Sequence, residues 1–279
     1  MKKILALILA LTMCALCFAA CDSGDAATTT AAATTAAATD AADEAATDGD
    51  LAYVQNKGKM IVGITDYAPM NYKDEAGNWT GFDTEFTYLV AEKLGVEVEF
   101  VEIVWATKAA ELETKNIDCV WNGMTITDEV KAAMDCSNPY VINAQVLVAK
   151  ADMVGNYKTF EDLKDVKFVA ERGSAGSAAI TEAGFTPVEV DTQAKALMEV
   201  ANGTADACVI DITMANAMTG EGTDYANLAS GLAFTVEEYG IGFRKGSDMV
   251  DAVNAIIAEL KADGTLEALA AKYELTLAE

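Results

Sequence analysis

The chain contains no histidine, which removes the side chain that most often serves as a general base or a metal ligand. Basic residues are also few, because 19 Lys and Arg stand against 44 Asp and Glu and give a net charge of −25 at pH 7. That sign excludes a nucleic acid as a partner, since affinity for phosphates depends on basic residues. The cysteines are not spaced as metal ligands, and we expect neither a metal ion nor a cofactor.

The N-terminus predicts export from the cytoplasm. Lys2 and Lys3 precede an apolar run over residues 4–16, which is typical of a signal peptide and too short for a stable membrane span. The sequence Phe18-Ala19-Ala20-Cys21 then resembles a lipobox. We expect residues 1–20 to be removed and Cys21 to be lipidated, which anchors the protein to the outer side of the cell membrane. An ordinary secretory signal with an incidental Cys21 is the alternative.

A segment of almost only Ala, Thr, Asp, Glu and Gly follows, over residues 21–50. It has no apolar periodicity and cannot bury enough surface to offset the entropy of ordering, so we expect a disordered linker. A flexible coil of this length reaches about 30 Å. That reach suits a tether between a membrane anchor and a folded body.

Three cysteines remain after the anchor, namely Cys119, Cys136 and Cys208. An extracytoplasmic location permits a disulfide between Cys119 and Cys136, whose segments we expect to lie side by side. Buried free thiols are the alternative.

The first part of the body alternates strands and helices. Strands are predicted over residues 60–64, 96–100 and up to Trp121. Between them lie a helix from Phe82 that Gly95 ends, and a helix after Trp105 with Asn116 as its left-handed cap. This β-α-β-α-β order predicts a parallel sheet with right-handed crossovers.

The second part predicts another α/β unit between two connecting strands. The connecting strands are expected over residues 144–150 and 239–245. They enclose strands over 167–170 and 206–211, with a helix over 193–202. Two amphipathic helices beginning near Ser247 and Thr265 complete the chain. We therefore predict lobe 1 over residues 51–143 plus 242–279, and lobe 2 over residues 144–241.

One stretch, residues 118–129, carries the features of a ligand site. A buried strand ends in polar residues, and Thr127 then begins a helix with acids in its first turn. In open α/β sheets, small ligands bind at such strand ends and helix N-termini.

This stretch, continued by residues 135–140, resembles the family motif D-A-V-x-x-G-x-T-I-T-x-E-R followed by D-F-S-x-P-Y. The family is that of bacterial extracellular solute-binding proteins, family 3, which serve amino-acid ABC transporters. Residues 66–72 are similar to its Y-x-P-F loop, residues 81–83 to its G-F-D and residues 206–211 to its D-A-x-x-x-D. The resemblance implies a two-lobed α/β fold of the type II periplasmic-binding-protein kind, with a hinge of two crossing strands and a ligand cleft between the lobes.

The resemblance also implies which residues touch the ligand. Asp211 would accept from an ammonium, or would cap the following helix. Tyr67 would stack on the ligand, or would be a core aromatic, and for Trp121 both roles stay open. The full predicted set is Tyr67, Tyr72, Trp121, Asn122, Gly123, Thr125, Arg172, Gly173, Ser174 and Asp211.

One departure from the family is at Val130, where the family has an arginine that clamps the ligand carboxylate. Arg172 would supply this charge from the opposite wall, or would be a surface residue paired with Glu171 or Glu182. The ligand is therefore an amino acid or a close analogue, or else a molecule without an α-carboxylate.

The sequence thus predicts a monomeric, membrane-anchored binding protein that delivers a small polar solute to ABC transporter permease subunits. Its lobes would close on the solute by a hinge. The alternative is an enzyme on the same fold, similar to cyclohexadienyl dehydratases. Without histidine, the acid and base of such an enzyme would have to be carboxylates such as Glu171 and Asp211.

Overall fold

The structure, a computed structural model, describes residues 49–279. The expected signal peptide, Cys21 and nearly all of the expected linker lie outside the described residues. The described part begins with helix α1 (Asp50–Lys57), so the folded body starts where we expected the linker to end.

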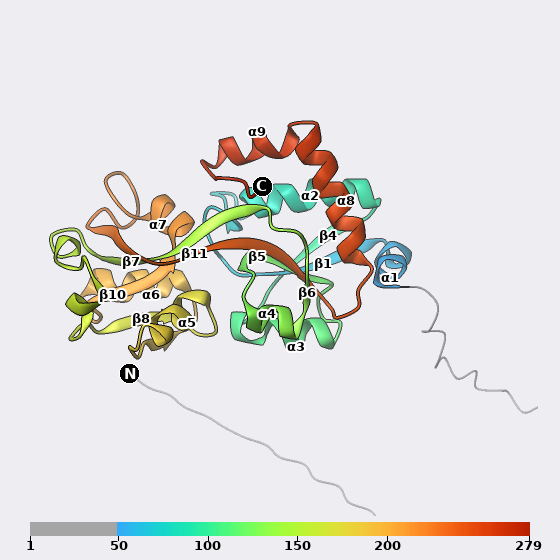
Figure 1. Ribbon diagram of the computed structural model, residues 1–279. Coiled ribbons are helices and arrows are strands. Elements are labelled where there is room, and N and C mark those ends of the chain that lie inside the picture. The colour runs from blue at the N-terminus through green and yellow to red at the C-terminus, as the bar shows by residue number, and fades with distance from the viewer. Residues whose placement is uncertain (1–48) are drawn as a thin grey trace, which may run out of the picture. The chain divides into compact units, whose positions relative to one another are not determined.

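Nine strands form one sheet within the described residues, in the order β4-β1-β5-β11-β7-β10-β8-β9, with β6 paired to β11 (Figure 1). A separate hairpin joins β2 and β3. The strands are β1 (Lys59–Ile64), β2 (Tyr72–Lys73), β3 (Trp79–Thr80), β4 (Glu97–Glu102), β5 (Cys119–Thr125), β6 (Asp135–Cys136), β7 (Val141–Lys150), β8 (Phe168–Glu171), β9 (Val188–Val190), β10 (Ala207–Asp211) and β11 (Leu228–Phe243).

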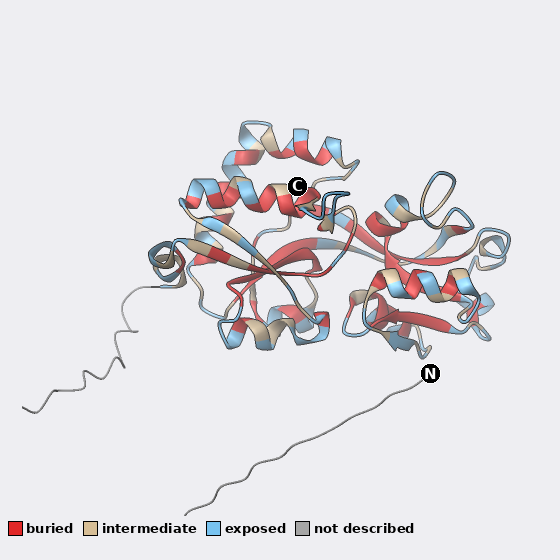
Figure 2. Cartoon of the chain, turned by 180° about the vertical axis from the view of Figure 1, so that it is seen from behind, coloured by how far each residue is buried: buried red, intermediate tan, exposed pale blue. Residues whose placement is uncertain are grey.

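Helices cover both halves of this sheet, and their inner faces are buried against it (Figure 2). No helix in residues 49–279 is both long and apolar enough to cross a membrane. After α1 the helices are α2 (Phe82–Leu94), α3 (Lys108–Glu113), α4 (Asp128–Ala133), α5 (Ala175–Glu182), α6 (Gln193–Asn202), α7 (Ile212–Met218), α8 (Met249–Ala262) and α9 (Thr265–Lys272), with 3₁₀ turns η1 (Trp105–Thr107), η2 (Val154–Asn156) and η3 (Phe160–Leu163).

The first half of the sheet follows the predicted β-α-β-α-β order. Strand β1 pairs in parallel with both β4 and β5. Gly95 ends α2 in a left-handed conformation, with φ of 73°. The expected left-handed cap at Asn116 was wrong, because Lys115 holds the positive φ, at 59°.

Strands β7 and β11 pair antiparallel and run between the two groups of helices (Figure 1). Strand β11 also pairs with β5, and β7 pairs with β10. These two strands therefore connect the first half of the sheet, β4-β1-β5, to the second half, β10-β8-β9. The sequence predicted only the end of β11, from residue 239. Its first part has two register shifts against β7, which interrupt the alternation that marks a strand.

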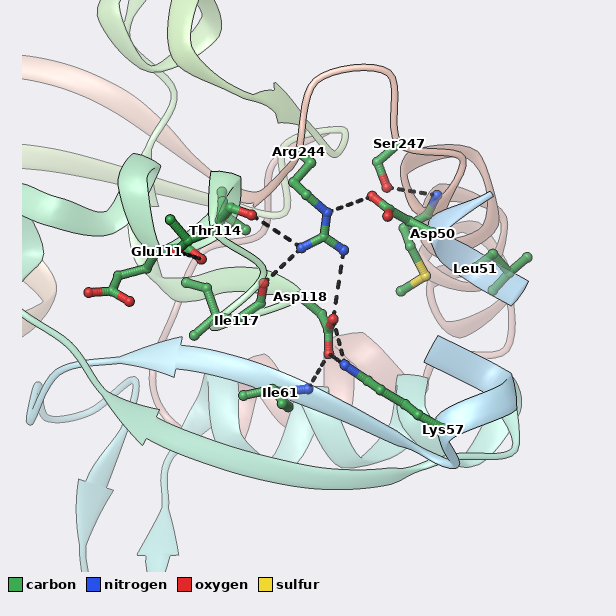
Figure 3. Close-up of polar contacts among 12 residues, drawn as sticks. Asp50, Leu51, Lys57, Ile61, Glu111, Thr114, Ile117, Asp118, Arg244 and Ser247 are labelled. Atoms are coloured by element: carbon green, nitrogen blue, oxygen red, sulfur yellow. Dashed lines mark hydrogen bonds and ion pairs between the residues drawn. The ribbon is translucent and has the colours of Figure 1, made fainter. Parts of the chain in front are cut away.

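A buried polar cluster fixes α1 to the first half of the body (Figure 3). The Arg244 guanidinium donates to Asp50 at 2.9 Å and to the Ile117 carbonyl at 2.8 Å. Lys57 donates to both oxygens of Asp118, at 2.8 and 2.6 Å, and the side chain of Asp118 is fully buried. This cluster therefore joins the first helix, the start of β5 and the end of β11.

The cysteines resolve the alternative left by the sequence. Cys119, Cys136 and Cys208 are all free thiols, and Cys119 and Cys208 are buried. Burial raises the pKa of the Cys119 and Cys208 thiols well above the usual value, which keeps them protonated and unreactive.

Candidate ligand site between the halves of the sheet

A cavity of about 130 Å³ lies between the two halves of the body. A water molecule needs only about 10–15 Å³, so the cavity is large enough for a small ligand. The first half supplies Trp105, Ala106, Lys108, Ala109, the segment from Asn122 to Thr125, Thr127, Glu129, Val130, Ala133 and Met134, and the second half supplies Glu171, Gly173, Ser174, Ala175, Ala178, Gln193 and Asp211.

Asp211 lies at the end of β10, and its carboxylate is held by donors from the connecting strands. Oδ1 accepts from Asn143 at 2.6 Å and from Gln145 at 2.7 Å on β7, and from the Tyr239 hydroxyl at 2.8 Å on β11. Oδ2 accepts from Gln193 at 2.5 Å. Asp211 makes no side-chain cap to α7, so the capping role was wrong.

A second carboxylate shares these donors. Oε1 of Glu237 on β11 accepts from Asn143, Gln145 and Thr125, each at 2.7 Å. Burial, and then the charge of Glu237, raise the pKa of Asp211 to about 7. Asp211 on β10 and Glu237 on β11 thus share the amide donors Asn143 and Gln145 of β7.

Glu171 ends β8 and lines the same cavity. Its side chain is buried, with only 3% of the residue exposed, and its Oε1 atom has no hydrogen-bond partner among the described residues. Burial raises the pKa of Glu171 to about 8; Asp211 adds to this increase, and Lys108 opposes it.

Lys108, at the start of α3, is the basic residue among those that line the cavity. Its ammonium lies 4.6 Å from the centre of the Trp105 ring and donates to the carbonyls of Trp105 at 3.4 Å and Gly173 at 3.2 Å. Burial lowers its pKa, whereas Glu129 and Glu171 raise it. Because Gly173 belongs to the second half, this ammonium contacts both walls of the cavity.

The rest of the first wall is largely apolar around Val130. This side chain is 9% exposed and belongs to a buried cluster with Trp105, Met124 and Met134. The position where the sequence motif would place an arginine is therefore part of a hydrophobic surface.

Residues 60–276 match the profile of bacterial extracellular solute-binding proteins, family 3. This match covers well over half of the chain. The protein belongs to this family.

Individual relatives agree with the family assignment. The chain is 33% identical to the L-cystine-binding protein TcyJ of Escherichia coli (strain K12) over 232 residues, which cover 82% of this chain and 87% of the relative. Among solved structures it resembles an ancestral arginine-binding protein bound to arginine, with a TM-score of 0.71 and 33% identity over 77% of this chain and 98% of the other. It also resembles an ancestral amino-acid-binding protein described as a precursor of cyclohexadienyl dehydratase, with a TM-score of 0.73 and 34% identity over 80% and 98%.

These comparisons confirm the predicted family and the two-lobed α/β fold. The relatives named here are binding proteins rather than enzymes, so a dehydratase is not the favoured interpretation.

Six of the ten residues predicted to touch the ligand line the cavity of this family member: Asn122, Gly123, Thr125, Gly173, Ser174 and Asp211. Several of their polar groups are already engaged. Asn122 donates to Thr65 at 2.6 Å and accepts from Asn71 at 2.8 Å. The Ser174 hydroxyl caps α5 by accepting from the Ser177 amide at 3.1 Å.

The other four predicted residues do not line the cavity. Tyr67 is buried, and its hydroxyl bonds to Thr213 at 2.5 Å and to Tyr239 at 2.6 Å, so it is a core aromatic rather than a stacking platform. Trp121 is fully buried with its ring edge to face against Phe86. Tyr72 lies in the β2–β3 hairpin.

Arg172 also turns away from the cavity. Its side chain is 55% exposed and lies 3.4 Å from a carboxylate oxygen of Glu189. Glu171 is the last residue of β8, whose four residues are all buried, whereas Arg172 lies beyond the end of the strand. The suggestion that Arg172 supplies the missing charge was wrong, and so were the partners expected for it on the surface.

The G-F-D segment, residues 81–83, stabilises the end of β5 through Asp83. Asp83 is buried, and its Oδ2 accepts from the Gly123 amide at 2.6 Å and from the Tyr140 hydroxyl at 3.0 Å. Burial raises the pKa of Asp83 to about 7. Gly123 has φ of 56°, and a Cβ atom there would lie 2.6 Å from the Tyr67 ring, so only glycine fits this end of β5.

The site also contains residues that the motifs did not indicate. Lys108 begins a short helix of mixed charge, and such a sequence is typical of a solvent-exposed helix. Asn143, Gln145 and Glu237 lie on the connecting strands, where polar residues are scattered among apolar ones. Only their position at the crossing of β7 and β11 gives them a role.

Proposed function

We propose that this protein is the lipid-anchored solute-binding component of an ABC importer and that it captures a free amino acid in the cavity between its lobes. The relatives named above bind L-cystine or arginine, which supports an amino acid as the ligand. The observation that carries the proposal is the pairing of an acid and a base on one cavity, Asp211 from the second half and Lys108 from the first.

The two charges suit the two ends of a zwitterion. The ammonium of the ligand lies at Asp211, whose carboxylate is oriented by four hydrogen bonds. Its carboxylate lies at Lys108, whose ammonium donates to two carbonyls and lies over an aromatic ring. Lys108 thereby takes the role of the arginine that Val130 replaces.

Closure in this proposal is a hinge motion about β7 and β11. Lobe 1 comprises residues 51–143 plus 242–279, and lobe 2 comprises residues 144–241. The contact from Lys108 to the Gly173 carbonyl crosses between these lobes and would break on opening. Capture thus excludes water from the charged groups and strengthens their interactions with the ligand.

Isothermal titration calorimetry of the ligand-free body against a panel of amino acids tests the capture function. We expect at least one to bind with micromolar affinity or better and Asp211→Ala to weaken it about 30-fold or more, since a buried charge pair loses one partner. Failure of every amino acid to bind at millimolar concentration would refute the proposal.

Anchoring is tested separately, in cells. In the proposal, Cys21 carries the lipid, residues 22–48 form the tether, and the body docks as a monomer on the permease subunits. We expect Cys21→Ser to lose the lipid label and to leave the membrane fraction or to retain its signal peptide. A variant that is labelled and anchored like the parent would exclude lipidation at this residue.

A further inference from the structure

Glu171 differs from the other buried acids of the body. Asp83, Asp118 and Asp211 each accept at least two hydrogen bonds. Asp83 also has one oxygen without a partner, Oδ1, but its other oxygen accepts two hydrogen bonds. The side chain of Glu171 takes part in no hydrogen bond among the described residues, although only 3% of the residue is exposed. A buried polar atom without a partner destabilises the protein, and more so when it is charged, so this side chain is suited to a partner that the ligand brings.

Glu171 and Asp211 also lie next to each other on the cavity wall. They end the neighbouring parallel strands β8 and β10, which pair from Phe168 and Ala207 onward. The carboxyl ends of parallel strands meet at one edge of the sheet, and both side chains line the cavity there. After burial, the charge of Asp211 contributes to the raised pKa of Glu171.

The charges around the cavity are not balanced by a neutral amino acid. Glu171 faces Asp211 from β10 and Lys108 from α3, while Glu129 of α4 faces Lys108 and Glu237 of β11 faces Asp211. A zwitterion brings one cation and one anion, and it leaves the excess of carboxylates unchanged. A ligand with one further cation provides a partner for Glu171 and favours its ionised form over the protonated form that burial favours in the ligand-free protein.

We propose that the ligand is an amino acid with a second cationic group, an ammonium or a guanidinium on its side chain, and that Glu171 accepts this group. The inference rests on the proposed capture of an amino acid and specifies its class. The α-ammonium lies at Asp211, the carboxylate at Lys108 and the side-chain cation at Glu171.

Two other occupants fit less well. No group of three or more acidic or cysteine side chains in residues 49–279 is arranged to hold a metal ion. Cystine has a second carboxylate as well as a second ammonium, and that carboxylate would need another cation beside Lys108. The residues that line the described cavity provide none.

The experiment compares pairs of amino acids that differ in the side-chain charge. Parent protein, freed of bound solute by unfolding and refolding, is titrated calorimetrically with lysine and norleucine and with arginine and citrulline. We expect the cationic member of at least one pair to bind about 30-fold more tightly or better, as for a buried charge pair. This comparison needs no mutant and is independent of any effect of substitution on folding.

Glu171→Gln then assigns the preference to this residue. We expect the variant to lose the difference between lysine and norleucine, or between arginine and citrulline, because the cationic member weakens relative to the neutral one. Glu182→Gln, an exposed glutamate on the next helix, is the matched control and keeps the preference.

The outcomes separate the two proposals. Neutral members that bind as tightly as cationic ones, a preference that survives in Glu171→Gln, or cystine as the tightest ligand would each overturn the assignment of Glu171 and leave capture of an amino acid standing. If no amino acid binds at all, the proposed function itself fails.

Discussion

The buried carboxyl of Glu171 should make the ligand-free protein less stable as the pH rises, and Glu171→Gln should remove this effect. Burial raises its pKa from the ordinary value of 4.5 to about 8 in the folded protein. Between these two values the folded state holds a proton that the unfolded state has released. Folding stability due to this group is therefore fully present below about pH 4.5 and decreases as the pH rises towards 8.

The shift sets the size of the effect. Each unit of pKa corresponds to about 1.4 kcal/mol, so a change from 4.5 to about 8 gives an upper limit of about 5 kcal/mol. We expect Glu171→Gln to be more stable than the parent by about 2–4 kcal/mol at pH 9, and by nearly nothing at pH 4. Asp83 and Asp211 also have a raised pKa, of about 7, but they are present in both proteins and largely cancel in the difference.

Urea unfolding, followed by tryptophan fluorescence at several pH values between 4 and 9 without ligand, measures this difference. Glu182→Gln should follow the parent at every pH, because this glutamate is exposed. If the free energies of unfolding of parent and Glu171→Gln change in parallel with pH, the buried and unpaired state of Glu171 is refuted.

Three further substitutions test other parts of the structure. Arg244→Met should lower the free energy of unfolding by about 2–4 kcal/mol, measured in urea, because it leaves buried groups around Asp118 without a donor; an unchanged midpoint would contradict this. Lys108→Met should weaken lysine about tenfold or more in calorimetry but should not weaken cadaverine, which lacks the carboxylate; an equal loss for both would move Lys108 away from the carboxylate. Gly123→Ala should cost about 1–3 kcal/mol in the same urea assay, because of its positive φ and the close Tyr67 ring, and full stability would show that β5 relaxes there.

Much of the fold could be predicted from the sequence because its signals are local. The helix over Phe82–Leu94 has an apolar face and a terminal glycine, and both are visible in a short window. Thr127 caps α4 as expected, by accepting from the Val130 amide at 3.1 Å. Strand β11 was recognised only in part, because its pattern depends on register shifts that the partner strand imposes.

The site was harder to predict because it depends on which way single side chains point. All four residues of β8 are buried, so the strand shows no alternation of buried and exposed positions that would mark which side chain at its end faces the cavity. The sequence therefore did not decide whether Glu171 or Arg172 faced the cavity, and the predicted ligand residues wrongly included Arg172. The sequence also did not decide the roles of Tyr67 and Trp121, because an aromatic residue near the end of a strand can contact a ligand or pack in the core.

The replacement of the family arginine by Val130 and the position of Lys108 can be understood together. Val130 and Trp105 belong to one apolar cluster on the first wall, and the Lys108 ammonium lies over the Trp105 ring beside that cluster. A cation on α3 rather than α4 lies closer to the second half of the body, because it reaches the Gly173 carbonyl. In the proposed function, one ammonium therefore both binds the ligand carboxylate and contacts the opposite lobe, so recognition of the carboxylate is coupled to closure.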